Sequence, residues 1–385
     1  MFKKKYDLAI INRSFWPESE ILGEAKLLLA EQVAQKGRAC VIAQALTNVE
    51  AELKRQNRGV GVKFYIAKSR SNSSSSLVRR VFDAVMFAPF VFWSLCRARP
   101  QHVYISTNPP VVVPFMVFLY CALFRAEYTY HLQDIHPEIT NIVLPMNMLV
   151  LKFLRGLDNI TLRHATHLVT LSEDMAEYLR KISRTKAPIH LIANPSFDMT
   201  DEIRNIPKTK DFVFCGNAGR VQQIPVLLAA IEAYISGGGK LNFSFAGGGV
   251  YVPQIEALAQ RYKQVSYEGY VKPSVANRLV AEHRWAILPI DDEVTKYAFP
   301  SKSSSYLASG CRILAICGKE TAVARWVHEY GAGVNVESEV QQVIQRFQEI
   351  EHSKHDEKSQ AKQQAKQQAL SPSDFAKAML RVVSA

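Results

Sequence analysis

Short apolar runs alternate with longer amphipathic segments through the first half of the chain. Strands are expected where these runs occur, at 8–12, 40–43, 103–106, 128–132, 165–171 and 189–192. Residues 24–36 have the apolar spacing of a helix that ends before Gly37, and another helix opens at 172–174 (SED). Short apolar strands joined by helical crossovers predict a parallel sheet that is covered on both faces.

The same alternation starts again after a polar, aperiodic stretch. Strands are expected at 212–215, 241–246, 265–268, 286–289 and 312–316, and helices at 224–234 and 253–262. We therefore predict a first α/β domain at 1–194, a linker at 195–210 and a second α/β domain at 211–350. Two such units in tandem make a cleft between their carboxyl-end loops, where open α/β sheets bind ligands. In the polar tail at 351–385, one helical face carries Phe375, Met379, Leu380 and Val383.

The composition is that of an ordinary globular protein. Of the 385 residues, 48% are apolar, which excludes wholesale disorder. The six cysteines are scattered, without a CxxC pair or a histidine at metal-ligand spacing, so neither a disulfide framework nor a structural metal site is expected. The first residues lack the apolar stretch of a signal peptide, and we therefore expect a cytoplasmic protein.

The positive charge is concentrated in the first third of the chain. Residues 1–125 contain 18 Lys and Arg against 8 Asp and Glu, and eight bases but no acid lie between Glu52 and Asp83. Such a stripe is either a solvated face or a surface for anionic lipid, acidic ligands or nucleic acid. The segment 53–82 has little aromatic interleaving and matches no nucleic-acid motif, so no nucleic-acid partner is expected.

Two apolar runs follow this basic stripe, at 81–96 and 111–124. Each is shorter than the roughly 20 residues that a membrane span requires, and each contains a proline. They are either buried core helices or an interfacial surface that dips into lipid headgroups beside the basic stripe. The residues expected on such a membrane and acceptor surface are Arg79, Arg80, Phe87, Phe90 and Trp93.

Glycine-rich loops after strands are candidates for binding an anion. Gly23 precedes the first helix, the segment 216–220 (GNAGR) follows a strand, and 247–249 is a run of three glycines. Without a side chain in the way, the backbone N–H groups of such loops can approach a phosphate, and the forked Arg220 guanidinium can bind its oxygens. Each glycine could equally permit a turn, and Arg220 could simply face solvent.

Two other clusters are candidates for chemistry. Residues 300–302 (PSK) open a helix, and a lysine just inside a helix start suits a phosphate site. A polar cluster at the end of the 128–132 strand is expected at the edge that faces the presumed cleft, although a buried and satisfied histidine is equally common in such a position. Its members are His131, Asp134, His136 and Glu138.

Five ordered motifs resemble glycosyltransferase family 4, in the branch that builds bacterial O-antigen, capsule and exopolysaccharide on lipid carriers. They are ISTNPPVVVPF (105–115), HLQDIHPE (131–138), VTLSEDMAEYLR (169–180), FCGNAGRVQQI (214–224) and YAFPSKSSSYLASG (297–310). The resemblance implies the α/β GT-B fold, in which two Rossmann-like domains face each other across a cleft and a C-terminal helix returns to the N-terminal domain. It implies a donor nucleotide sugar on the C-terminal domain, with UDP as the expected nucleotide, and an acceptor on the N-terminal domain. It further implies retaining, metal-independent transfer without a cofactor.

The resemblance also assigns roles to residues of this chain. Arg220 and Lys302 would neutralise the donor diphosphate as the sugar–oxygen bond breaks, and His131 or Asp134 would contact the transferred sugar. The expected acceptor is a lipid-diphosphate-linked saccharide, with the protein peripheral on the inner face of the plasma membrane at an anionic surface. The residues expected to bind the donor are Gly23, Gly216, Asn217, Gly219, Gly247, Gly249, Tyr270, Val271, Ser301, Ser305 and Tyr306.

One departure from the family pattern leaves a second function open. The family usually has a Glu, seven residues and then a second Glu that binds the ribose hydroxyls, and Tyr297 and Ser305 stand at these positions here. Ser305 can hydrogen-bond a ribose hydroxyl but supplies no charge, so weaker donor binding is expected. A degenerate GT-B scaffold that holds a partner or a lipid is the alternative. A sugar-nucleotide epimerase is disfavoured because its acid and base carboxylates are not evident in the second half.

Overall fold

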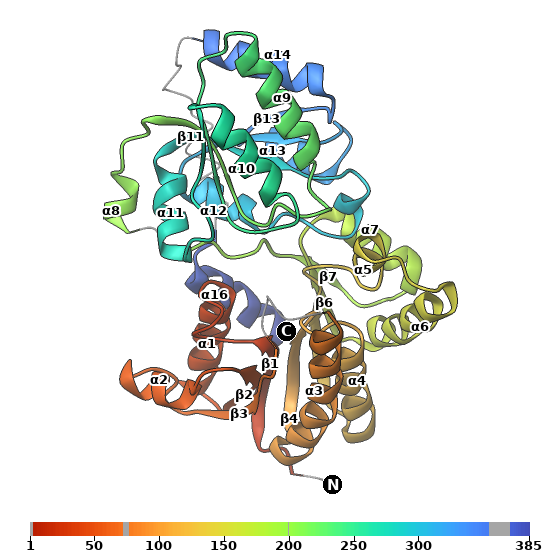
Figure 1. Cartoon of the computed structure of the whole chain (residues 1–385). Coiled ribbons are helices and arrows are strands. Elements are labelled where there is room, and N and C mark those ends of the chain that lie inside the picture. Colours follow the sequence, from red (N-terminus) through yellow and green to blue (C-terminus); the bar gives the residue numbers. More distant parts are fainter. Residues whose placement is uncertain (1–2, 72–76, 199, 354–369) are drawn as a thin grey trace. The chain divides into compact units, whose positions relative to one another are not determined.

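The chain folds into two units, each built on its own sheet (Figure 1). The structure is a computed structural model that describes residues 3–71, 77–198, 200–353 and 370–385. Unit 1 comprises Met1–Pro195 together with Ser371–Ala385, and unit 2 comprises Ser196–Leu370. The boundary at Pro195 lies at the start of the stretch 195–210, which contains the short helix α8 (Asp201–Arg204).

Unit 1 contains a seven-stranded sheet whose strands pair in parallel in the order β3-β2-β1-β4-β5-β6-β7. The middle residues of the central strands, such as 8–11 of β1, 39–43 of β2 and 103–105 of β4, are apolar and buried, as in strands that are covered on both faces. The strands are β1 (Tyr6–Ser14), β2 (Ala39–Ala45), β3 (Val62–Lys68), β4 (Pro100–Ser106), β5 (Glu127–His131), β6 (His167–Thr170) and β7 (Ile189–Leu191).

The helices of unit 1 include one from the far end of the chain. They are α1 (Leu22–Ala34), α2 (Val49–Arg55), α3 (Leu77–Ala98), α4 (Val112–Phe124), α5 (Glu138–Val143), α6 (Met148–His164), α7 (Glu173–Ser183) and α16 (Pro372–Val383). The helix α16 packs against α1 and β5, which confirms the predicted return of the C-terminal helix. Its buried residues include Ala376 and Val382 besides the predicted Phe375 and Met379.

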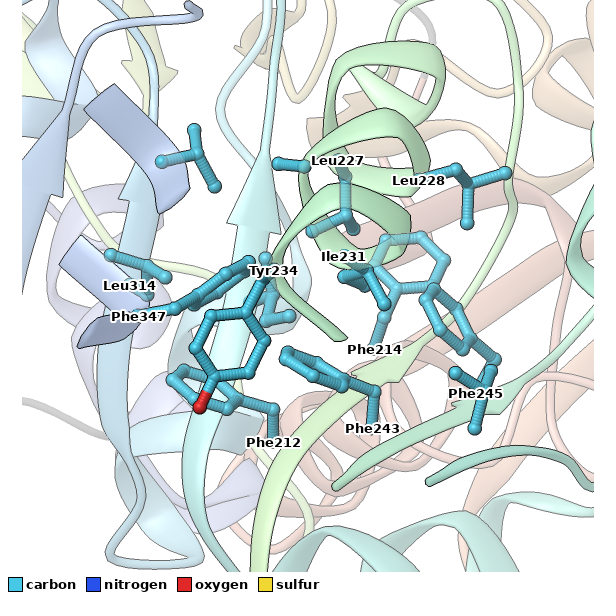
Figure 2. Close-up of a cluster of buried hydrophobic side chains, with 14 of the residues drawn as sticks. Phe212, Phe214, Leu227, Leu228, Ile231, Tyr234, Phe243, Phe245, Leu314 and Phe347 are labelled. Atoms are coloured by element: carbon cyan, nitrogen blue, oxygen red, sulfur yellow. The ribbon is translucent and has the colours of Figure 1, made fainter. Parts of the chain in front are cut away.

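Unit 2 contains a six-stranded parallel sheet in the order β10-β9-β8-β11-β12-β13. Its core is aromatic: Phe212, Phe243 and Phe347 lie with ring centroids 5.0–5.3 Å apart (Figure 2). The strands are β8 (Lys210–Cys215), β9 (Phe243–Ala246), β10 (Val265–Tyr267), β11 (His283–Pro289), β12 (Arg312–Ile316) and β13 (Gly333–Val336). The remaining helices are α9 (Ile224–Ser236), α10 (Val252–Arg261), α11 (Pro273–Ala281), η1 (Val294–Lys296), α12 (Lys302–Ala308), α13 (Ala322–Glu329) and α14 (Val340–His352).

Every strand that the apolar runs predict is present, but two strands of the structure are not predicted by these runs. The strand β3 is only half-buried, and Lys63 and Lys68 interrupt its apolar pattern and belong to the basic stripe in sequence. The strand β13 has four residues and begins with a glycine. Both lie at the edge of their sheets, where one side of the strand has no neighbour and the apolar pattern is weak.

The apolar runs at 81–96 and 111–124 lie in α3 and α4, which pack against each other. Both helices have a buried face, and α3 also exposes large apolar side chains such as Phe82 and Trp93. In the parts of the chain that the structure describes, no helix is both long enough and apolar enough to span a bilayer.

Candidate active site

The glycine loops of unit 2 meet at the carboxyl edge of its sheet. The Gly216 amide donates to the Ala246 carbonyl at 2.7 Å, and the Ala218 amide donates to the Gly248 carbonyl at 2.6 Å. A Cβ on Gly247 or Gly249 would collide with the backbone of the 216–218 loop, and both residues have a positive φ (+122° and +134°). These two glycines are thus explained by the close approach of two loops, with no ligand required.

The side chain of Lys302 covers one of these loops. Lys302 is the first residue of α12, and a Cβ on Gly216 would collide with the end of its side chain. Within the described part of the chain, the ammonium makes no hydrogen bond and no ion pair. Burial lowers the pKa of Lys302, opposed by the nearby Cys215 thiol. A desolvated cation without a counter-ion beside an open backbone loop is suited to binding an anion.

The other predicted donor residues of 216–220 lie on the same loop. Asn217 and Arg220 are exposed, whereas Gly219 is buried and its amide donates to the Gln222 side chain at 3.0 Å. The Gly219 amide is therefore already used within the loop. A second predicted element, Tyr270 with Val271, follows β10, and the Tyr270 side chain is 85% exposed. Its turn is fixed to the glycine loops because the Gly247 amide donates to the Gly269 carbonyl at 2.8 Å.

The residues predicted from α12 divide between surface and core. Ser301 is exposed and Ser305 is half-buried, so both can meet a ligand. Tyr306, in contrast, is buried, and its hydroxyl is hydrogen-bonded to the backbone of Cys215 at 3.1 and 3.2 Å. The expectation that Tyr306 contacts the donor is therefore corrected: one helical step turns it inward, where it fixes α12 to the end of β8.

A carboxylate that the sequence analysis did not single out lies beside Tyr297. The Tyr297 hydroxyl donates to Glu293 Oε1 at 3.0 Å, and Lys296 Nζ lies 2.6 Å from Glu293 Oε2. The hydrogen bond from Lys296, with a smaller contribution from Tyr297, keeps the pKa of Glu293 below its usual range. The spacing of one helical turn between Glu293 and Tyr297 was the signal that could have revealed it.

In unit 1 the four residues of the predicted cluster at the end of β5 have different surroundings. His131 is fully buried, its Nδ1 lies 2.7 Å from the Tyr104 hydroxyl, and its ring lies 5.8 Å from that of Phe375 on α16. Burial, with the nearby Lys26 as a smaller cause, lowers the pKa of His131 to about 3. The expectation that His131 stands at an open edge is corrected, because α16 covers this part of the sheet.

Two more members of the cluster also face inward. His136 Nδ1 lies 2.7 Å from the Thr140 hydroxyl, and burial lowers the pKa of His136 to about 4. Glu138 accepts a hydrogen bond from Tyr178 at 2.7 Å and forms an ion pair with Arg155. His136 is therefore hydrogen-bonded to α5 itself, and Glu138 links the start of this helix to α6 and α7.

Asp134 is the member of the cluster that remains available. It lies in the loop after β5 and is half-buried, and its carboxyl makes no hydrogen bond or ion pair with any residue that the structure describes. Burial raises the pKa of Asp134 to about 6. A half-buried carboxyl without a partner at the carboxyl edge of a parallel sheet is a candidate acid or base.

Unit 1 also holds a buried lysine that the sequence analysis missed. Lys26 on α1 is buried, its ammonium donates to the Ser106 hydroxyl at 3.3 Å, and burial lowers its pKa to about 7. The signal was a single base inside the apolar helical stretch 25–30 (AKLLLA). On the same helix, a Cβ on Gly23 would lie 2.6 Å from the Trp16 amide nitrogen, so loop packing alone requires this glycine.

The residues predicted for a membrane surface on α3 differ in their exposure. Arg79 is exposed, and Trp93 is 55% exposed with the Arg97 guanidinium over its ring. Phe90 is half-buried and Phe87 is fully buried, because Phe87 lies on the face of α3 that packs inward. Phe87 is therefore removed from the expected surface. The side chain of Arg80 lies outside the described residues.

Among the residues that the structure describes, no group of three or more His, Cys, Asp or Glu side chains is placed to hold a metal ion. The charged groups that stand out at the two candidate edges are Lys302, with Arg220 on the neighbouring loop, in unit 2 and Asp134 in unit 1. Lys302 offers a cation to an anionic ligand. Asp134 offers a carboxyl whose pKa is raised to about 6.

Comparison with known proteins shows which family model and which solved structures this chain is similar to. Residues 25–195 match the model of the glycosyl transferase 4-like domain. Over 286 residues, the chain is 27% identical to the "Probable glycosyltransferase WbjE" of Pseudomonas aeruginosa. The alignment covers 69% of this chain and 70% of that protein.

Solved structures with low sequence identity share the fold across almost the whole chain. The structure of Anabaena HepE in complex with UDP has a TM-score of 0.65 at 14% identity and covers 98% of this chain and 99% of that one. Sucrose-phosphate synthase from Thermosynechococcus elongatus has a TM-score of 0.65 at 12% identity. The match covers 98% of this chain and 96% of that one. The predicted GT-B fold, with its two parallel-sheet α/β domains, is confirmed.

Proposed function

We propose that this chain, which is a glycosyltransferase of the family 4-like group with the GT-B fold, transfers a sugar from a UDP sugar to a lipid-diphosphate-linked saccharide. The choice of UDP is supported by the UDP complex of HepE, whose fold this chain shares. The lipid-linked acceptor and a role in bacterial surface polysaccharide are supported by the five motifs at 105–310.

The observation that carries the proposal is the position of Lys302. Its ammonium lies over Gly216 at the carboxyl edge of the unit 2 sheet, desolvated and without a counter-ion among the described residues. As the sugar–oxygen bond of the donor breaks, negative charge grows on the departing diphosphate. A preorganised cation in a partly dry site stabilises such charge far better than water does. Arg220 on the same loop is the second cation for this role.

The ribose of the donor is proposed to contact Ser305. Its half-buried hydroxyl is one turn along α12 from Lys302, so a nucleotide whose diphosphate reaches Lys302 can place its ribose nearby. A neutral hydroxyl contributes less than a carboxylate to such a contact. Donor binding is therefore expected to be weaker than in relatives that have a Glu here.

Asp134 is proposed to act on the acceptor side. Its carboxylate could accept the proton of the attacking hydroxyl or hydrogen-bond the transferred sugar, and transfer is proposed to retain the anomeric configuration without a metal. With a pKa near 6, Asp134 is mostly ionised at neutral pH and still basic enough to accept a proton. The acceptor diphosphate and its membrane are proposed to meet the basic and apolar surface of α3, which includes Arg79 and Trp93.

The test is a transfer assay with a panel of nucleotide sugars and a lipid-diphosphate-linked monosaccharide, in chelator-treated buffer. Product with UDP sugars alone supports the proposal, and product with another nucleotide would correct the base. Thermal unfolding with the same panel is run in parallel. A folded protein that shows neither transfer nor stabilisation by any nucleotide sugar would favour the degenerate scaffold over the enzyme.

A further inference from the structure

The start of α6 exposes large apolar side chains. Leu149 is 76% exposed, Phe153 64% and Met148 61%, and Ile142 and Leu144 in the preceding segment are exposed as well. These five side chains lie within 12 residues of one another in sequence. Scattered apolar residues on a surface need no explanation, but a local group of this size marks a surface that meets something other than water.

The segment that carries these residues contains bases but no acids in its sequence. No acid lies between Glu138 and Asp158, and the bases in this interval are Lys152 and Arg155. Arg155 is buried and paired with Glu138 and Asp158, which leaves Lys152 exposed among the apolar side chains. An apolar surface whose exposed charge is positive fits the headgroup and acyl boundary of an anionic bilayer.

A second group of exposed apolar side chains lies on another helix of unit 1. The helix α4 packs against both α3 and α6, so the three cover the same side of the unit 1 sheet (Figure 1). On α3, Phe82, Val85 and Met86 are about half exposed, next to the exposed Arg79. Basic and apolar side chains thus occur together on two helices of one layer.

The start of α6 lies far from the contact that the other end of α6 makes with α4. The ring of His164, at the end of α6, lies 4.9 Å from that of Phe118 in the middle of α4. With a rise of about 1.5 Å per residue, Met148 lies about 24 Å from His164 along the helix axis. The chain runs from the loop with Asp134 through the short helix α5 to this end of α6.

We infer that the first two turns of α6, residues 148–153, insert into the headgroup and acyl boundary of an anionic membrane next to the acceptor end of unit 1. This inference rests on the proposed function, because it explains how a lipid-linked acceptor reaches Asp134. The α3 surface supplies charge attraction, and the α6 start supplies apolar insertion. The two contributions differ in their response to salt, since screening weakens only the first.

The experiment measures flotation of the full chain with vesicles of phosphatidylglycerol and phosphatidylethanolamine, at low salt and at 1 M salt. Leu149→Ser/Phe153→Ser is compared with wild type and with the control Val60→Ser, which changes a 73% exposed residue elsewhere in unit 1. We expect wild type and the control to keep a salt-resistant bound fraction. The double variant should lose about tenfold in partition, mostly at high salt, because apolar burial and not charge is removed.

A tryptophan placed at the surface gives a second readout. In Phe153→Trp the fluorescence should shift to the blue when vesicles are added, whereas in Val60→Trp it should not. Equal flotation of the double variant and wild type, or no blue shift in Phe153→Trp, would overturn the inference. The inference would also be overturned if wild type sedimented as a dimer and the double variant as a monomer, because a second copy would then cover these side chains.

Failure of this inference can be told apart from failure of the proposed function. Stabilisation by UDP sugars does not involve α6 and is expected in wild type, the double variant and the control alike. If vesicle binding is absent but UDP sugars still stabilise the protein, only the membrane insertion is wrong. If vesicle binding follows the expectation but no nucleotide sugar binds, the insertion stands and the donor site fails.

Discussion

Both units contain a desolvated lysine, and the two lysines have opposite consequences. Lys26 in unit 1 and Lys302 in unit 2 each have a pKa lowered mainly by burial. Neither forms an ion pair with any residue in the described parts of the chain. Lys26 is fully buried between α1 and β4, on the side of the sheet that α16 covers. Lys302 is half-buried, and its side chain ends over an open loop.

The difference illustrates a physical condition: a buried cation can serve as a binding group only where a ligand can replace the water that it lost. At Lys302 an incoming diphosphate would supply the missing counter-charge, so the cost of desolvation is offset when the donor binds. At Lys26 the packed helix leaves no access, and the same cost reduces the stability of unit 1. Replacing each lysine should therefore change a different property of the protein.

The largest effect is expected from Lys302→Met. Loss of this cation should lower kcat/KM by roughly 100- to 1000-fold, the usual result of removing one group that stabilises developing charge. Because a desolvated ammonium disappears as well, the unliganded variant should unfold at a higher temperature than wild type. Lys240→Met, which changes an exposed lysine of the same unit, is the control and should alter neither quantity. Near-normal turnover of Lys302→Met would remove Lys302 from the reaction.

Lys26→Met should change stability and leave donor binding intact. The pKa of Lys26 is about 7 in the folded state against 10.5 in the unfolded chain. The unfolded state therefore binds more protons between these values, and the stability of wild type should rise with pH by up to about 1.4 kcal/mol per unit in that window. The variant should be more stable by about 4 kcal/mol at pH 7 and lose this advantage toward pH 10.5.

Urea unfolding of wild type and Lys26→Met at pH 7 and pH 10 measures this prediction. Equal stability gains at the two pH values would mean that better packing, and not removal of the ammonium, is the cause. A destabilised variant would contradict the assignment of Lys26 as an uncompensated cation, since its hydrogen bond to Ser106 would then outweigh the desolvation.

Asp134→Asn should reduce turnover by about 100-fold if the carboxylate assists the acceptor, the lower end of the range for general acid–base groups. The pKa of Asp134 is raised to about 6, so wild-type activity should fall as the pH decreases through 6 while the carboxylate is protonated. The variant should lack this acidic limb. A pH profile that keeps the limb in Asp134→Asn would assign the titration to another group.

Ser305→Glu is expected to have the smallest effect and to restore the family pattern on unit 2. A charged acceptor for the ribose hydroxyls should strengthen UDP binding by about tenfold, the difference between a charged and a neutral hydrogen bond. Titration with UDP measures it, and Ser301→Glu on the exposed side of the same segment is the comparison. Weaker binding in Ser305→Glu would show that the ribose lies elsewhere.

The sequence predicted the sheets well because apolar strands covered on both faces have a strong signal, as in β1 and β4. It predicted less of the site, because periodicity places a residue near the end of a strand but not the helix that will cover it. His131 is the example, since the cover comes from α16, about 240 residues further along the chain. Tyr306 was likewise one helical step from the ligand side, and Lys26 became evident only through its burial.

The central claim is that Lys302 forms a donor diphosphate site on unit 2, and UDP titration by calorimetry tests it most directly. Wild type, Lys26→Met and Lys240→Met should bind UDP with equal affinity. Lys302→Met should show no measurable heat, although its unfolding temperature is not lower than that of wild type. Binding of UDP to Lys302→Met with the wild-type affinity would contradict the account.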